Sequence, residues 1–180
     1  FTDSRINDML KEEKQSVEIV NPISSDLNVL RSSIFSNLLS YLKKNLDRDI
    51  KDISLFEIGP TFYGNKPGQQ EIVIGALRSG LVSRLNWIEK ERKLDVFDAK
   101  RDVIQSLAEI GLDQNKFKIT SKAPSYYHPG KSGSINRNND ERVPIAYFGE
   151  IHPNILQELE IKTEALIVFE IYLDRVKLSK

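Results

Sequence analysis

The sequence feature that most constrains the fold is a wide apolar stripe within residues 21–46. Asn21-Pro22 predicts a turn, because proline fixes its own φ and disfavours helix at the residue before it. After this turn, apolar residues recur at steps of three and four in two adjacent rows, which are Leu30, Ile34, Leu38 and Tyr41, and Phe35, Leu39, Leu42 and Leu46. This spacing places both rows on one side of a helix, which we predict over residues 30–46.

The stripe is wider than one contact surface needs, and two interpretations follow. In the first, the helix is wedged into the core of its own domain. In the second, one row packs on the domain's own sheet and the other contacts a partner subunit. That outer row would then be exposed apolar surface in the isolated chain. The candidate interface residues are Arg31, Phe35, Leu38, Leu39 and Leu42.

Length and composition exclude several classes of protein. The chain has 180 residues, enough for one domain with a real core, and we predict a single domain over residues 1–180. Its 26 basic and 26 acidic residues argue against a surface-wide electrostatic footprint for nucleic acid, although a local contact stays possible. The absence of cysteine excludes disulfides and thiolate metal sites. The longest apolar runs are too short to cross a bilayer. Because the chain starts at Phe1 without a methionine, we expect a fragment of a longer protein.

The remaining apolar patterns alternate between strands and single helices. We predict strands over residues 16–20, 53–63, 72–81, 117–120, 125–135, 143–151 and 165–173, and helices over residues 3–10, 95–110 and from 153. The strands 53–63 and 165–173 are apolar on both faces, which predicts that both are central and covered. Hairpins separated by single helices are typical of an α+β domain with a mainly antiparallel sheet flanked by helices.

Few polar residues suggest a catalytic or metal-binding role. Glu57 lies inside the predicted strand 53–63 and would need a partner, such as an ion pair. His128 and His152 each precede a proline, which suits a turn or the start of a helix. Glu150 and His152 could share a metal only with distant ligands. The phosphate-binding, dinucleotide-binding and nucleophile-elbow motifs are absent, so the residues alone indicate no catalytic constellation.

Taken together, six motifs resemble the core domain of the β subunit of phenylalanyl-tRNA synthetase in its bacterial form. They occur in the family's order and cover most of the chain: Asn21–Ser24, Val29–Ser33, Leu55–Gly59, Phe97–Lys100, Tyr127–Ser132 and Phe148–Pro153. The ordered set, rather than any one motif, is specific.

The resemblance implies a class II aminoacyl-tRNA synthetase-like fold, related to the catalytic domain of the α subunit. It also implies an α2β2 enzyme, which uses ATP and magnesium to charge phenylalanine onto its tRNA. The expected partners are the α subunit, a second αβ unit and, through the whole enzyme, the tRNA. The family's use of the first motif in subunit assembly favours an interface at the helix 30–46. We expect a cytoplasmic location and no membrane contact.

Comparison with catalytic class II domains implies a non-catalytic role. Those domains carry Phe-Arg-x-Glu, whose arginine holds the ATP phosphate, where this chain has Phe62-Tyr63-Gly64-Asn65. They also carry Gly-x-Gly-x-x-Arg near the last strand, but residues 165–180 contain no glycine. We therefore expect no catalytic, cofactor-binding or metal-binding residue in this chain. The alternatives are an active class II ligase or adenylating domain, and a free-standing regulatory paralogue of a synthetase.

Overall fold

A six-stranded antiparallel sheet forms the centre of the molecule. The computed structural model describes residues 1–11, 16–22, 24, 27–83, 91–138 and 142–176. The strand order is β3-β4-β10-β9-β8-β7, and every neighbouring pair is antiparallel. The strands are β3 (Ile53–Phe62), β4 (Gln70–Ser79), β7 (Phe117–Thr120), β8 (Tyr127–Arg137), β9 (Ala146–Ile151) and β10 (Leu166–Tyr172). The predicted α+β domain with a mainly antiparallel sheet is confirmed.

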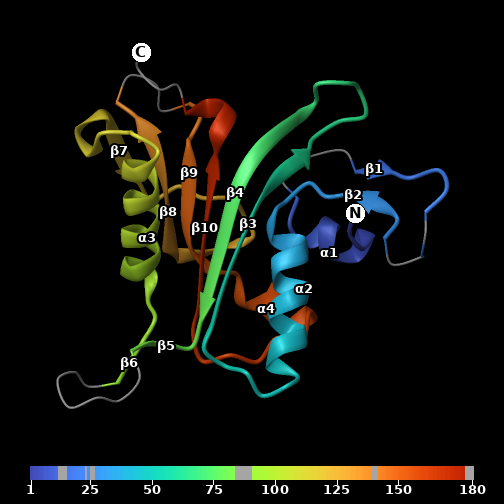
Figure 1. Cartoon of the computed structure of the whole chain (residues 1–180), viewed down its shortest axis with the longest axis horizontal. Helices are drawn as coiled ribbons and strands as arrows, with labels where there is room; N and C mark the ends of the chain where they lie inside the picture. The colour runs from blue at the N-terminus through green and yellow to red at the C-terminus, as the bar shows by residue number, and fades with distance from the viewer. Residues whose placement is uncertain (12–15, 23, 25–26, 84–90, 139–141, 177–180) are drawn as a thin grey trace.

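Helices cover both faces of this sheet (Figure 1). The helix α2 (Phe35–Leu46) packs on one side, which we call the α2 face, together with α1 (Ser4–Met9) and α4 (Pro153–Glu158). The helix α3 (Val96–Glu109) packs on the other side, the α3 face. No helix in the described ranges is long and apolar enough to cross a membrane.

Short elements complete the chain. The strands β1 (Val17–Glu18) and β2 (Val29–Leu30) pair with each other, as do β5 (Leu81–Ser83) and β6 (Arg92–Lys93). Two 3-10 helices, η1 (Gln114–Lys116) and η2 (Leu173–Arg175), precede β7 and follow β10.

The helix α2 starts later than the sequence pattern predicts. Its first residue is Phe35, whereas residues 29–30 form β2 and the chain turns before the helix begins. The backbone N–H of Phe35 donates to Ser33 Oγ at 3.2 Å, and Ser36 Oγ donates to the Ser33 carbonyl at 3.1 Å. Serine side chains compete in this way with regular helix, so the serines set a boundary inside the apolar pattern.

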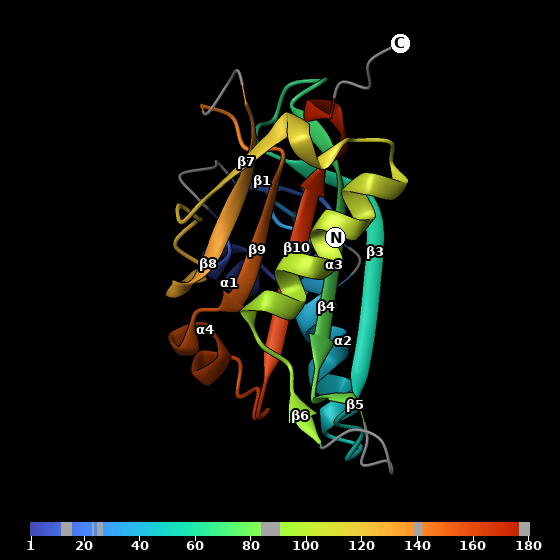
Figure 2. The same ribbon diagram turned by 90° about the vertical axis from the view of Figure 1, so that its left-hand side faces the viewer.

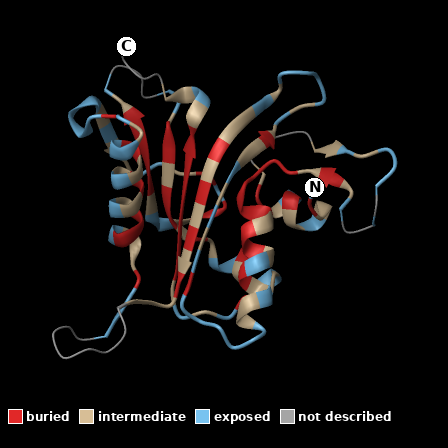
Figure 3. Cartoon of the chain, in the orientation of Figure 1, coloured by how far each residue is buried: buried red, intermediate tan, exposed pale blue. Residues whose placement is uncertain are grey.

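The two strands predicted to be central differ in position. β10 lies between β4 and β9, and all seven of its residues are buried, as predicted (Figure 3). β3 is instead the edge strand (Figure 2). The helix α3 lies over β9 and β10, which leaves Phe56 75% exposed and Ile58 57% exposed on the α3 face. The prediction of a central β3 is therefore wrong, because apolar residues on both faces of a strand do not require a neighbour on both edges.

The start of α3 carries a capping box. Asp95 Oδ1 accepts from the backbone N–H groups of Phe97 and Asp98, and Asp98 Oδ2 accepts from the N–H of Asp95. Arg92 donates to both carboxylate oxygens of Asp98 at 2.8 Å. The Arg92 hydrogen bonds lower the pKa of Asp98, while its burial opposes this effect.

This lowered pKa predicts a pH-dependent contribution to stability. The unfolded Asp98 binds a proton more readily than the folded one, so the contribution is complete above the unfolded pKa and is lost as the pH falls through the folded pKa. Between about pH 5 and pH 3, the free energy of unfolding should therefore fall more steeply in the wild type than in Asp98→Asn. Chemical denaturation at several pH values measures both slopes. Asp113→Asn, at an exposed cap, is the control, and equal slopes for Asp98→Asn and the wild type would contradict the prediction.

Candidate functional site

A buried carboxylate lies in the middle of the α2 face. Glu170 on β10 is 1% exposed and lies between Gly75 on β4 and Tyr147 on β9. Its Oε1 accepts hydrogen bonds from the hydroxyls of Tyr126 at 2.6 Å and Tyr127 at 3.3 Å. Its Oε2 accepts from the hydroxyl of Tyr172 at 3.1 Å. We call Glu170 and these three tyrosines the Glu170 cluster.

Aromatic rings surround this carboxylate. Phe35, the first residue of α2, makes edge contacts with Tyr126 and Tyr127 at centroid distances of 6.3 Å and 6.1 Å. Tyr147 bridges Tyr127 at 6.2 Å and Tyr172 at 6.0 Å. Burial, followed by the charge of Glu170, raises the pKa of the three cluster tyrosines well above its ordinary value. The three hydroxyls are therefore donors at neutral pH, and none is poised to act as a base.

The start of α2 also lies directly on the sheet. A Cβ atom added to Gly75 would lie 2.3 Å from Ile34 Cγ2, which is closer than any real contact. Only glycine at this position lets Ile34 approach the strand between Glu57 and Glu170. The close approach at Gly75 is thus a packing contact within the chain.

Two arginines on the α2 face are each paired with a glutamate. Arg31 binds the carboxylate of Glu57 and is the ion-pair partner that the sequence predicted for it. Arg31 Nε also donates to the Pro60 carbonyl at 2.9 Å. Arg175 after β10 binds both carboxylate oxygens of Glu71 at 2.7 Å and stacks on the Tyr172 ring at 3.7 Å. The bidentate pair of Arg175 with Glu71 occupies the same donors that an arginine uses to bind a phosphate.

The stretch that the resemblance aligns with the ATP-binding motif lies in the hairpin between β3 and β4. Phe62 ends β3, and residues 63–69 form the turn to β4. The Tyr63 N–H donates to the Gln69 carbonyl at 3.1 Å, and its hydroxyl donates to the Gly68 carbonyl at 3.4 Å. Neither Tyr63 nor Asn65 carries a charge that could replace an arginine or a glutamate.

The candidate interface residues lie inside the chain's own core. Phe35, Leu38, Leu39 and Leu42 are at most 2% exposed, and Arg31 is 7% exposed. One side of α2 meets the sheet, and apolar residues of α1 and α4 join the same core. The prediction that one row would be exposed in the isolated chain is therefore wrong. The outward-facing aromatic of α2 is Tyr41, which is 54% exposed. The assignment of α2 to a subunit interface stays a prediction.

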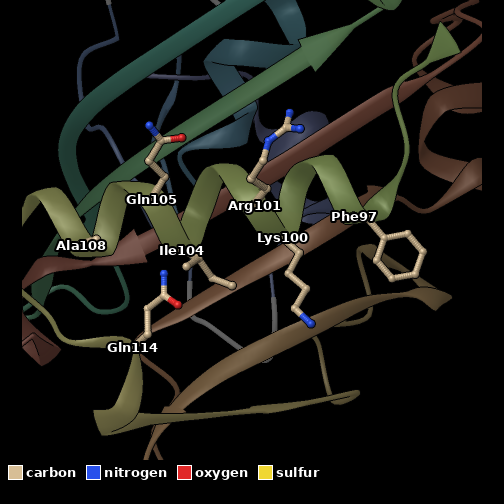
Figure 4. Close-up of a pocket in the computed structure, with 7 residues that line it drawn as sticks. All are labelled: Phe97, Lys100, Arg101, Ile104, Gln105, Ala108 and Gln114. Carbon is tan, nitrogen blue, oxygen red and sulfur yellow. The ribbon is translucent and has the colours of Figure 1, made fainter.

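A groove runs along the outer side of α3 (Figure 4). This groove has a volume of about 410 Å³ and is lined by Phe97, Lys100, Arg101, Ile104, Gln105, Ala108 and Gln114. Lys100 and Ile104 point to one flank of the helix, and Arg101 and Gln105 point to the other. The lining includes no carboxylate and no histidine, so it offers no acid–base pair.

The two histidines have the local roles that their prolines suggested. His128 Nδ1 accepts from the backbone N–H of Gly130 at 3.0 Å, and His152 Nδ1 accepts from that of Asn154 at 3.2 Å, at the start of α4. Within the described ranges, no three residues of the types His, Cys, Asp and Glu lie close enough together to hold a metal.

Sequence reasoning missed Glu170 and Arg175. A signal for Glu170 was present, because it is the one charged residue in the strand Leu166–Tyr172. The argument that assigned a partner to Glu57 applies equally to this residue. Nothing in the local pattern pointed to Arg175, whose partner Glu71 lies 104 positions away in the sequence.

The fold is shared with a solved aminoacyl-tRNA synthetase. The structure of PylSc from Desulfitobacterium hafniense, a pyrrolysyl tRNA synthetase, matches 97% of this chain and 58% of its own with a TM-score of 0.65. A crystal structure of the pyrrolysyl-tRNA synthetase from the same organism also matches, with a TM-score of 0.61. The sequence identities of 14% and 15% establish the fold alone, and they confirm the predicted class II synthetase-like architecture.

Sequence relatives identify the family. The chain is 39% identical over 164 residues to the phenylalanine–tRNA ligase β subunit of Paramagnetospirillum magneticum, and 38% identical over 167 residues to that of Rhodospirillum rubrum. These matches cover 91% and 93% of this chain but 20% of each relative, so the chain spans a fifth of their length. The family model of the phenylalanyl tRNA synthetase β chain CLM domain matches residues 1–173. The chain therefore belongs to the phenylalanyl-tRNA synthetase β-chain family, as a match to its CLM domain.

Proposed function

We propose that this domain is a non-catalytic core of the β subunit of phenylalanine–tRNA ligase, which supports assembly of the enzyme. The observation that carries the proposal is the Glu170 cluster. Its three tyrosines are each at most 4% exposed and, with Phe35, fill the middle of the α2 face. A protein that binds ATP and an amino acid on this face would need open space and unpaired cations there.

The charges of the α2 face support the same proposal. Arg31 is paired with Glu57 and Arg175 is paired with Glu71, so neither guanidinium is free to bind an ATP phosphate. The hairpin between β3 and β4 has Tyr63 and Asn65 where the catalytic motif has arginine and glutamate. Two independent features thus argue against adenylation by this domain.

The whole enzyme is proposed to act in the cytoplasm as an α2β2 assembly. Its α subunit would bind ATP and magnesium and join phenylalanine to the tRNA. This domain would hold no cofactor and would contribute through contacts with the α subunit or with a second αβ unit. The alternative of an active ligase domain is disfavoured by the paired arginines and the filled sheet face.

Capture of the α subunit tests the assembly role. We expect the chain to co-purify with its cognate α subunit, and we expect Tyr41→Asp on the outer side of α2 to weaken capture about tenfold or more, as for an aromatic anchor. Val143→Asp, at a residue that is 49% exposed, is the matched control. Capture by Tyr41→Asp at wild-type strength would exclude this side of α2, and absence of capture by the folded wild type would reject the assembly role.

A further inference from the structure

A fully buried amide joins α1 to the segment that leads into α2. Asn7 is 0% exposed and is the one buried residue of α1. Its Oδ1 accepts two hydrogen bonds from Ser32, one from the backbone N–H at 2.7 Å and one from Oγ at 2.9 Å. Its Nδ2 donates to Ser16 Oγ at 3.4 Å. Because a buried polar group that loses its partner is costly, these bonds fix Ser32 relative to α1.

Ser32 lies in a short buried segment, residues 31–34, in which each residue is at most 7% exposed. Arg31 binds a glutamate of β3, and Ile34 lies against a glycine of β4. The residue between these two contacts is bound by Asn7 from α1. The segment is therefore fixed between the sheet and α1, and α2 begins directly after it.

The first turn of α2 depends on this segment because it lacks an ordinary cap. Its N-cap residue, Ile34, has helical dihedral angles, and its side chain accepts no hydrogen bond. The Ser33 hydroxyl instead accepts from the Phe35 N–H at 3.2 Å. Ser33 follows Ser32 directly, so its position depends on the bonds that Asn7 makes. Loss of those bonds should let the segment and the first turn of α2 open locally while the sheet stays folded.

We propose that Asn7 is a positioning residue for assembly. By binding Ser32 it gives the start of α2, and with it the outer side of the helix that carries Tyr41, one fixed orientation before the α subunit binds. This inference rests on the assembly role proposed above. A partner that needs α2 in this orientation binds only those molecules in which the first turn is closed, so its apparent Kd rises as that fraction falls. Fixing the orientation in advance removes an ordering cost that would oppose binding.

Capture of the α subunit by Asn7→Ala tests the proposal. The Ser32 N–H then has no acceptor, and we expect the closed fraction to fall to about a tenth, which weakens capture about tenfold. Hydrogen exchange at the Ser32 amide should become about tenfold faster or more. Circular dichroism confirms that the variant is folded. If it does not fold, Ser32→Ala takes its place, because this change removes only the hydroxyl bond and should weaken capture about threefold.

Two controls distinguish positioning from general stability. Val103→Ala truncates a fully buried side chain of α3 on the other face of the sheet, so it should destabilise the fold comparably but leave capture unchanged. Arg5→Ala alters α1 itself, removes a 3.4 Å bond to the Glu158 carbonyl and should also leave capture unchanged.

The outcomes separate the two proposals. Capture by Asn7→Ala at wild-type strength, or equal weakening by Val103→Ala, would overturn the positioning role of Asn7 and leave the assembly role standing. Absence of capture by the folded wild type would reject the assembly role, and the positioning role with it.

Discussion

Glu170→Ala is expected to destabilise the domain by about 3–9 kcal/mol, because three buried hydroxyls lose their acceptor and each unsatisfied group costs about 1–3 kcal/mol. This loss is comparable with the whole stability of many domains, which is about 5–15 kcal/mol. Urea denaturation followed by circular dichroism measures the free energy of unfolding. We expect Glu170→Ala to be partly unfolded before denaturant is added.

Three further variants distinguish the loss of hydrogen bonds from the loss of side-chain volume and charge. Glu170→Gln keeps the volume and one acceptor oxygen, so it should cost less than Glu170→Ala. Tyr127→Phe removes only the longest of the three bonds and should cost about 0.5–1.5 kcal/mol. Glu150→Ala removes a carboxylate from a partly exposed pair with Lys131 and should cost at most about 1 kcal/mol. If Glu170→Ala costs no more than Glu150→Ala, the cluster does not hold this face together.

Leu39→Ala is expected to cost about 2–5 kcal/mol, as is usual when a fully buried leucine is truncated. Leu39 is 0% exposed within the core that α2 shares with the sheet, α1 and α4. Polar replacements of Phe35, Leu38 or Leu42 should likewise unfold the domain, so capture of the α subunit and the fold should be lost together. Thermal denaturation and the capture assay on the same samples measure both effects.

Tyr41→Ala is the control for this series. Its side chain is on the same helix but 54% exposed, so the free energy of unfolding should change by about 0.5 kcal/mol or less. If Leu39→Ala lowered the free energy of unfolding no more than Tyr41→Ala, α2 would not be a core helix. The interpretation that one of its apolar rows contacts a partner subunit would then be favoured.

The sequence could predict those elements whose signals are local. The caps of α3 at Asp95 and Gly111, the hairpin turn before β4 and the helix start at His152 depend on nearby residues, and the structure has all of them. The position of β3 could not be predicted in this way. Periodicity reports which faces of a strand are apolar, but it does not report how many strands lie beside it.

The candidate site depended on contacts between distant segments. Glu170 receives its hydroxyls from residues 43 and 44 positions earlier as well as from β10 itself, so no spacing rule joins them. The two rows of α2 were visible in the sequence, but their burial depends on α1 and α4, which arrive from opposite ends of the chain. For this reason the pattern could not distinguish a core helix from an interface helix. The single tryptophan of the sequence, Trp87, could anchor a contact or pack over a hairpin or helix end, and it lies outside the described residues.

Pyrophosphate exchange tests most directly whether this domain, which has the class II fold, lacks the adenylation chemistry. The folded chain is incubated with phenylalanine, ATP, magnesium and labelled pyrophosphate, beside the complete αβ enzyme as the positive control. We predict exchange by the complete enzyme and none above background by the isolated chain, because its arginines are paired and its sheet face is filled. Phenylalanine-dependent exchange by the isolated chain, lost on Arg175→Ala, would show instead that this domain activates phenylalanine itself.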